Sequence, residues 1–168
     1  MGISERKLNP AGSTSTPPFR SVGFMLSSLG YAVSRRFHDV LAPLELEPSE
    51  FAVLRAVGFS EGQSQQALAE RLHISASHMV AIVDRLQERG LVERRPHVGD
   101  RRVRSLHLTK AGEKLLAQAF ELAKQFEQLL TKPLNAKERM ELLSLLERIA
   151  AALELQPGVH AALRENGS

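Results

Sequence analysis

The 168-residue sequence predicts a mainly α-helical fold with one small β-hairpin. Aromatic residues make up only 5% of the chain and Trp is absent, so the core must consist mainly of Leu, Ala, Val and Ile, which favours helices. Apolar residues recur at spacings of three and four along most of the chain, as in amphipathic helices. Only residues 91–108 contain two short alternating segments, which are typical of strands.

The chain length fits one domain with two tails. Residues 1–18 are small, polar and proline-rich, so we expect a flexible N-terminal arm there. The domain is predicted over 19–156, and 157–168 form a short C-terminal tail. Within the domain, a central lobe at about 48–108 lies between helical segments at about 19–44 and 109–156.

The first two helices are predicted from their apolar spacing and their prolines. The first runs from the region of Val22 until Pro43 marks its end. The second begins at Pro48, whose fixed φ suits the first helical position. We expect Gly58 and Gly62 to end it.

A helix-turn-helix is predicted next. Ser64 caps the short helix QQALAERL, and only His73 and Ile74 separate that helix from SASHMVAIVDRLQERG. The small Ala69 allows the two helices to cross closely. His73 lies where the turn requires a positive φ, which histidine tolerates better than most residues.

The rest of the domain consists of a hairpin and two helices. After Gly90, the segments LVERRP and VRSLHLT are joined by HVGDRR, which predicts a β-hairpin with a basic tip. Thr109 is placed to cap a long helix through residue 131. Asn135 and Glu138 have capping-box spacing and open a last helix, which we expect Pro157 and Gly158 to end.

Several function classes are disfavoured by what the sequence lacks. With no cysteine, the chain has no disulfides, thiolate zinc sites or thiol redox chemistry. The six histidines form no i, i+4 pair, and no glycine-rich phosphate loop or serine elbow is present, so we expect no metal, no cofactor and no enzyme. No apolar run reaches the length of a membrane span and no signal peptide is visible, so we expect no membrane association and a cytoplasmic location.

Positive charge is concentrated in one segment. Between Arg89 and Lys110, seven cations stand against two acids, a larger excess than the +3 of the whole chain. Most of these cations are arginines, which bind phosphate and guanine in a bidentate manner. A helix-turn-helix followed by an arginine-tipped hairpin is a winged helix-turn-helix, in which one helix enters the major groove and the wing contacts the backbone or minor groove. The predicted partner is therefore double-stranded DNA.

Helical periodicity selects the candidate DNA-contacting residues. If Met79, Val83 and Leu86 point inward, the opposite face and first turn of that helix can read bases. The preceding helix start suits phosphate, because free backbone amides point there. The candidates are Ser75, Ser77, His78, Ala81 and Arg85 for bases, Ser64, Gln65 and Gln66 for phosphate, and Arg94, Arg95, Asp100, Arg101, Arg102 and Arg104 on the wing.

Structural explanations stay open for some of these residues. Arg85 could pair with an acidic neighbour instead of phosphate, and His78 could simply be exposed. The wing could be a solvated basic hairpin without a DNA contact.

The segment GDRRVRSLHLTKAG resembles the Asp-x-Arg wing signature of the multiple antibiotic resistance regulator (MarR) family, with Asp100 and Arg102 in its key positions. The resemblance extends from about Phe24 to Leu153 and includes VLAPLELEPSEFAVL and LAERLHISASHMVAIVDRLQERGLVERR. It implies that Asp100 holds Arg102, that Arg102 enters the minor groove, and that the terminal helices form a homodimer on a pseudopalindrome. It also implies an effector pocket between the first two helices and the fifth. Ordinary core packing would explain the candidate lining almost as well, namely Phe24, Tyr31, Phe37, Phe51 and Phe59.

Two departures from the family pattern have consequences. His78 and Ala81 stand where relatives often carry Thr and Arg, so the operator sequence cannot be transferred from relatives. Glu47 replaces the usual Thr or Ser cap, so we expect that helix start to be weakened by roughly 1 kcal/mol.

Dimerisation has support from the residues themselves. The first and last helices carry apolar stripes too broad for a small DNA-binding lobe to cover. On the last helix the stripe consists of Leu142, Leu145, Leu146, Ile149 and Leu153. A symmetric mate would bury it and would space two recognition helices about 34 Å apart. The sequence thus predicts a homodimeric, ligand-responsive repressor on a pseudopalindromic operator, and the alternative is a non-specific architectural or protein-interaction module.

Overall fold

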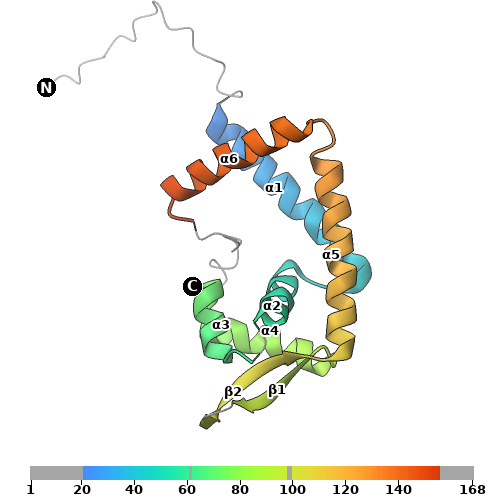
Figure 1. Cartoon of the computed structure of the whole chain (residues 1–168), viewed down its shortest axis with the longest axis vertical. Helices are drawn as coiled ribbons and strands as arrows, with labels where there is room; N and C mark the ends of the chain where they lie inside the picture. Colours follow the sequence, from blue (N-terminus) through green and yellow to red (C-terminus); the bar gives the residue numbers. More distant parts are fainter. Residues whose placement is uncertain (1–20, 61, 98–99, 156–168) are drawn as a thin grey trace, which may run out of the picture. The chain divides into compact units, whose positions relative to one another are not determined.

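The computed structural model describes residues 21–60, 62–97 and 100–155, with the side chains of 97 and 100–103 left aside. Its elements follow the predicted order (Figure 1). They are α1 (Val22–Leu41), the 3₁₀ turn η2 (Ala42–Leu44), α2 (Pro48–Phe59), α3 (Gln65–Leu72), α4 (Ala76–Glu88), β1 (Val92–His97), β2 (Asp100–Leu108), α5 (Lys110–Leu130) and α6 (Ala136–Ala152). The mainly helical class with one hairpin is confirmed.

The chain divides after Arg36 into two compact units. The first contributes most of α1, on which the Arg35 guanidinium lies 5.8 Å from the centre of the Tyr31 ring, within cation–π range. The second unit contains every other helix and both strands.

The core of the second unit is built around α2. This helix packs against α3, α4, α5 and β2, and it is apolar on most of its surface because it has neighbours on several sides. From α4, Met79, Val83 and Leu86 are completely buried, as the periodicity predicted. Ala69 is also buried where α3 meets the core.

The helix-turn-helix has the predicted cap at Ser64 and turn at His73, together with a cap at Ser75 that the sequence analysis did not name. The hydroxyl oxygen of Ser64 accepts the N–H of Ala67 at 3.1 Å, and that of Ser75 accepts the N–H of His78 at 3.3 Å. Between the helices, His73 has φ of 52°, and the N–H of Ile74 donates to the Ala69 carbonyl at 3.0 Å. These bonds fix the angle between α3 and α4.

The wing is longer than the sequence predicted. Strands β1 and β2 pair antiparallel from Val92↔Leu108 to Pro96↔Arg104, with a register shift before His97. The backbones of His97 and of 100–102 belong to the strands, so most of the predicted HVGDRR connection is sheet. The shift after Pro96 explains the extension, because residues 101–103 of β2 have no partner on β1 and the pairing resumes at His97↔Asp100.

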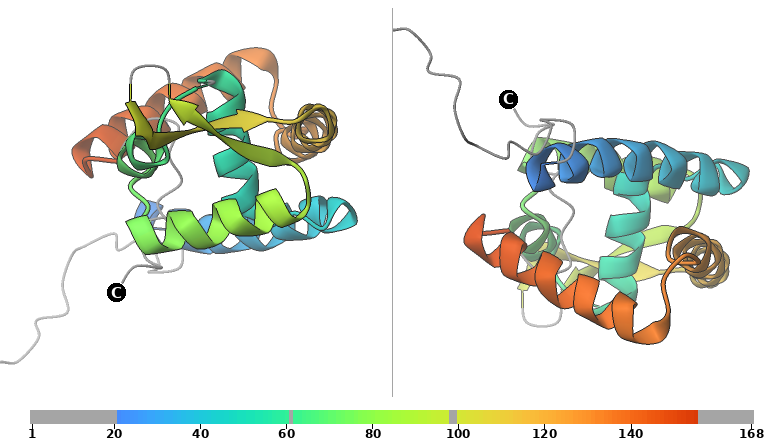
Figure 2. Two further views of the ribbon diagram at one scale, coloured as in Figure 1. Left: turned by 90° about the horizontal axis from the view of Figure 1, so that it is seen from below. Right: turned by 90° about the horizontal axis from the view of Figure 1, so that it is seen from above.

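A short segment before α3 joins the wing to the helix-turn-helix. The N–H of Gly62 donates to the Leu106 carbonyl at 3.2 Å, and the N–H of Leu106 donates to the Gln63 carbonyl at 3.0 Å. Ser64 then forms a β-bridge with Ser105. The wing and α4 consequently lie at the same end of the second unit, and both face the viewer in the left panel of Figure 2.

Two helix ends differ from the prediction. Gly58 does not end α2, which continues to Phe59. A Cβ at Gly58 would lie 2.9 Å from Leu116 Cδ2 and 3.1 Å from Leu108 Cδ1, so this glycine permits close packing of α2 against α5 and β2. Helix α6 ends at Ala152 through Leu153 and Glu154, whose φ is 54°, whereas Pro157 and Gly158 lie outside the described residues.

The two C-terminal helices begin as predicted. Thr109 caps α5 by accepting the N–H of Gly112 at 3.0 Å. Asn135 and Glu138 form the capping box of α6, with reciprocal bonds of 3.0 and 2.8 Å. None of the residues of α6 is buried within the single chain. No helix in the described part of the chain has the length and hydrophobicity to cross a membrane.

Candidate nucleic-acid interface

The outward face of α4 carries the predicted reading residues. Ser77, Ala81 and Arg85 are exposed, and His78 is half-buried. The Ser75 hydroxyl caps the helix and lies 3.4 Å from the Ser77 hydroxyl, so its role in this structure is local. Sequence reasoning missed Val80, which is 42% exposed. The three-residue spacing from Ser77 would have placed it on this face.

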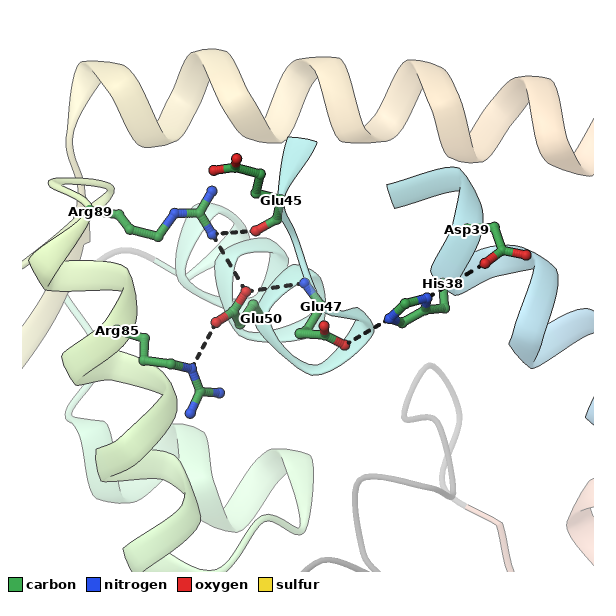
Figure 3. A network of polar contacts seen from close by, with 7 residues as sticks. All are labelled: His38, Asp39, Glu45, Glu47, Glu50, Arg85 and Arg89. Atoms are coloured by element: carbon green, nitrogen blue, oxygen red, sulfur yellow. Dashed lines mark hydrogen bonds and ion pairs between the residues drawn. The ribbon is translucent and has the colours of Figure 1, made fainter. Parts of the chain in front are cut away.

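Arg85 has an acidic partner. Its Nε donates to Oε1 of Glu50 at 2.9 Å, across 35 residues of sequence (Figure 3). The pairing that the sequence left open as an alternative to phosphate contact is therefore present. A DNA contact by Arg85 stays a prediction.

Glu50 also caps the start of α2 at Glu47. The Glu50 carboxylate accepts the N–H of Glu47 at 3.1 Å, as one half of a capping box between the two residues. The start of α2 is therefore better capped than the sequence predicted. The prediction considered only the residue type at position 47 and not the carboxylate three residues further on.

The start of α3 uses its side chains internally. Ser64 is the cap, Gln65 Oε1 accepts from Arg94 Nε at 3.0 Å, and the Gln66 amide donates to Glu70 at 3.1 Å. The first-turn backbone N–H groups of a helix have no intrahelical partner. They remain the suitable phosphate donors here, and that role stays a prediction.

The arginines of the wing differ in their surroundings. Arg94 Nε bonds to Gln65, its Nη1 bonds to Gln87 at 3.1 Å, and its Nη2 lies 2.6 Å from Asp84 Oδ1. Its side chain is only 22% exposed. These contacts join β1 to both helices of the helix-turn-helix.

The other wing arginines are closer to solvent. Arg95 pairs with Glu93 on its own strand. Arg104 is exposed and has no hydrogen-bond or ion-pair partner within the described part of the chain. The backbones of Asp100, Arg101 and Arg102 belong to β2, but their side chains lie outside what the structure describes.

Three of the five predicted pocket residues come together. Ring centres of Phe37 and Phe51 lie 5.8 Å apart, and both Phe51 and Phe59 contact Phe120, at 5.6 and 5.9 Å. Phe126 extends the row by lying 5.9 Å from Phe37. Sequence reasoning did not name Phe120 or Phe126 for this site; both lie on α5. Phe24 and Tyr31 belong to the first unit.

No group of three metal-binding side chains gathers among the residues described. The side chains brought together at the exposed face of α4 and on the wing are hydroxyls, an imidazole, guanidinium groups and a small apolar side chain. Such a set suits duplex DNA, because arginines match phosphates and short side chains fit base edges.

The comparisons with known proteins agree with this geometry. The family model described as the MarR family matches residues 44–103. A putative transcriptional regulatory protein for the hcr operon of Thauera aromatica is 31% identical over 129 residues, which cover 76% of this chain and 78% of that protein. The transcriptional repressor NicR of Pseudomonas putida is 29% identical over 140 residues, covering 83% and 89% of the two chains.

Solved structures give the same result. The transcriptional repressor CouR, bound to a 23-mer DNA duplex, is 36% identical and superposes with a TM-score of 0.70 over 77% of this chain and 92% of its own. A MarR variant from E. coli in complex with operator DNA is 27% identical with a TM-score of 0.67, over 76% and 91%. Sequence, fold and relatives thus agree, and the chain belongs to the MarR family of transcriptional regulators.

Proposed function

We propose that two copies of this chain bind a pseudopalindromic DNA operator and repress transcription until a small molecule weakens that binding. The observation that carries the proposal is the placement of the exposed face of α4 and the arginine-bearing hairpin at one end of the same unit. A helix and a wing on one side can occupy a major groove and the adjacent minor groove together. The DNA-bound relatives support this arrangement.

The proposed DNA contacts fall into two groups, with α4 on base edges and the wing on phosphates or the minor groove. Ser77, His78 and Ala81 on α4 would meet base edges, where short side chains donate, accept or touch a thymine methyl. Exposed Arg104, with Arg101 and Arg102, would meet phosphates or the minor groove, and Asp100 would orient Arg102. The DNA-binding lobe in this proposal comprises residues 48–108, with dimerisation through 19–44 and 109–156.

Dimer formation is supported by the unburied stripe of α6. Leu142, Leu145, Leu146 and Leu153 are exposed in the single chain. Burying apolar area contributes about 25 cal/mol per Å², so a symmetric partner that covers the stripe stabilises both copies. Two recognition helices could then lie about 34 Å apart, which is one turn of DNA.

The aromatic row supports ligand response. Phe51 is buried, whereas Phe59 is 75% exposed at the end of α2, so the row runs from the core to the surface of the second unit. Flat apolar effectors stack on such rings. Phe24 and Tyr31 remain proposed contacts. In this proposal the chain regulates transcription and catalyses no reaction. It acts in the cytoplasm, where it can reach the operator.

Selection of bound duplexes from a random pool tests the function. We expect enrichment of a pseudopalindrome whose half-sites are centred about one helical turn apart. If the pool stays random after several rounds while the chain still retains DNA, the chain is an architectural protein that binds without sequence preference. If no duplex is retained at low salt, the proposal fails.

Two variants separate DNA positioning from base reading. Arg102→Ala should weaken binding to all sequences and flatten the slope of log K against log salt by about 0.9, provided the lost contact is to phosphate. His78→Ala should change the preference among operator variants and leave the slope as it is. Equilibrium binding at four or more salt concentrations measures both. An unchanged slope and affinity in Arg102→Ala would refute the assignment of the wing.

A further inference from the structure

A nearly buried carboxylate lies beneath the proposed recognition helix. The Glu50 side chain is only 5% exposed and accepts the N–H of Glu47 at 3.1 Å. A buried charge is costly unless other charges and hydrogen bonds compensate it. Here the compensation comes from α4, because Arg85 Nε lies 2.9 Å and Arg89 Nη1 lies 3.5 Å from the Glu50 oxygens (Figure 3).

The two arginines are held in different ways. Arg89 also donates to the backbone carbonyls of Glu45 at 2.7 Å and Leu44 at 3.0 Å, so it connects the end of α4 to the segment before α2. Arg85 has Glu50 as its only partner within the described residues, and its side chain is 48% exposed. Arg85 is therefore the guanidinium that could also reach solvent or phosphate.

Arg85 is the one arginine between Ala76 and Glu88. The acids on this helix are Asp84, which pairs with Arg94 of the wing, and the exposed Glu88. With Arg85 neutralised by Glu50, α4 offers no unpaired guanidinium to the DNA backbone.

We propose that Glu50 is a specificity-determining positioning residue. It keeps Arg85 in an ion pair and so prevents the recognition helix from binding phosphates of DNA of any sequence. The inference rests on the DNA-binding function proposed above and assigns a role to a residue that touches no DNA. If Arg85 left Glu50 to pair with a phosphate, the buried charge of Glu50 would lose one of its two arginine partners. The ion pair therefore persists when random DNA is near. The helix then binds chiefly through base edges.

The variant Glu50→Gln tests the proposal. Its amide oxygen still accepts the N–H of Glu47, and the side chain keeps its shape while losing its charge. On a random duplex we expect the slope of log K against log salt to steepen by about 0.9, as for one added phosphate contact. Affinity for that duplex should rise about fivefold at low salt, and affinity for the selected operator should rise less. A purely structural role would weaken binding to both duplexes and would not steepen the slope.

Two matched variants isolate the ion pair. Glu88→Gln removes the same charge from the exposed face of α4, and it should leave the salt slope unchanged because Glu88 holds no arginine within the described residues. In the double variant Glu50→Gln/Arg85→Ala, the steeper slope should disappear. Persistence of the steeper slope in that double variant would show that another cation is responsible and would overturn the proposal.

A measurement on the unaltered protein covers the case in which Glu50→Gln does not fold. The Nε–H resonance of Arg85, assigned by comparison with Arg85→Lys, should be protected from solvent exchange in the DNA-free protein. It should keep its position when a random duplex is added. A resonance that is lost to exchange without DNA, or that shifts on adding random DNA, contradicts the proposal.

The outcomes separate this inference from the function on which it rests. If the unaltered chain binds no duplex, the proposed function is wrong. If the unaltered chain selects an operator and the folded Glu50→Gln variant has the same salt slope and the same operator preference, only the role of Glu50 is wrong.

Discussion

At the scale of single residues, Gly112 has the closest backbone neighbour of any glycine in the described part of the chain. This residue lies in the first turn of α5, where the Thr109 N–H donates to the Leu91 carbonyl at 3.1 Å and the Thr109 hydroxyl donates to the Gly90 carbonyl at 2.7 Å. A Cβ at Gly112 would overlap the Leu91 carbonyl oxygen. The neighbour is backbone, so it cannot move aside cheaply.

Gly112→Ala should therefore lower the free energy of unfolding by about 2 kcal/mol, although Ala is the better helix former. Urea unfolding at one fixed protein concentration measures the change. Ala117→Gly, at an exposed position of the same helix, gives the size of the propensity effect alone, about 1 kcal/mol. A Gly112→Ala protein as stable as the original would show that the approach to Leu91 is looser than described.

Residue-scale prediction from sequence worked where the chemistry is local. The caps at Ser64, Thr109 and Asn135 were predicted because donor and acceptor are three residues apart, whereas Ser75 was named only as a base contact. The pairing of Arg85 with Glu50 was open beforehand only as a general possibility, since its partners are 35 residues apart. A spacing rule contains no information about which distant acid folds beneath an arginine.

At the scale of elements, Arg94 joins the wing to the helix-turn-helix. Its guanidinium contacts Gln65 on α3 and both Asp84 and Gln87 on α4. We expect Arg94→Ala to reduce the free energy of unfolding by about 1–2 kcal/mol, because three polar partners lose a shared donor at a partly solvated site. Thermal unfolding at fixed concentration provides the measurement.

Arg104→Ala is the matched control for Arg94. Arg104 is exposed on the same hairpin without a described partner, so its loss should change stability by less than about 0.5 kcal/mol. Its effect should instead appear as weaker DNA binding with a flatter salt dependence. Equal stability losses in the two variants would contradict the division between joining and DNA-facing arginines.

The order and type of the elements were predictable, and their ends less so. Periodicity and capping residues identified six helices and the hairpin, because each signal is contained within one segment. Gly58 was misinterpreted as a helix end because its role is to admit Leu116 from α5, a contact between distant segments. The hairpin extends further than predicted because a register shift at Pro96 preserves the pairing.

At the scale of the whole molecule, the exposed stripe on α6 requires a second copy in the proposed function. Leu142→Glu places a charge in that stripe, which should raise the dimer dissociation constant by at least about 100-fold. Sedimentation velocity over a range of protein concentrations measures the shift. Glu147→Gln, on the opposite face of the same helix, should leave the dimer intact. A Leu142→Glu chain that stays dimeric at the same concentrations would place the interface elsewhere.

The sequence predicted the outline of the whole molecule, a dimer with a winged helix-turn-helix in each copy. It could do so because the wing signature, the helix-turn-helix and the apolar stripes each occur in one stretch of chain. The aromatic row was predictable only in part. Phe37, Phe51 and Phe59 were named. Phe120 joined them through the packing of α5 on α2, and Phe126 through its contact with Phe37 near the end of α1, neither of which periodicity specifies.

Hydroxyl-radical footprinting on a selected duplex tests most directly whether paired chains grip DNA with a helix and a wing each. The account predicts two protected segments related by a twofold axis, with centres about 10 base pairs apart and further protection where each wing meets the flanking backbone. A single protected block without symmetry, or even protection along the whole duplex, would contradict it.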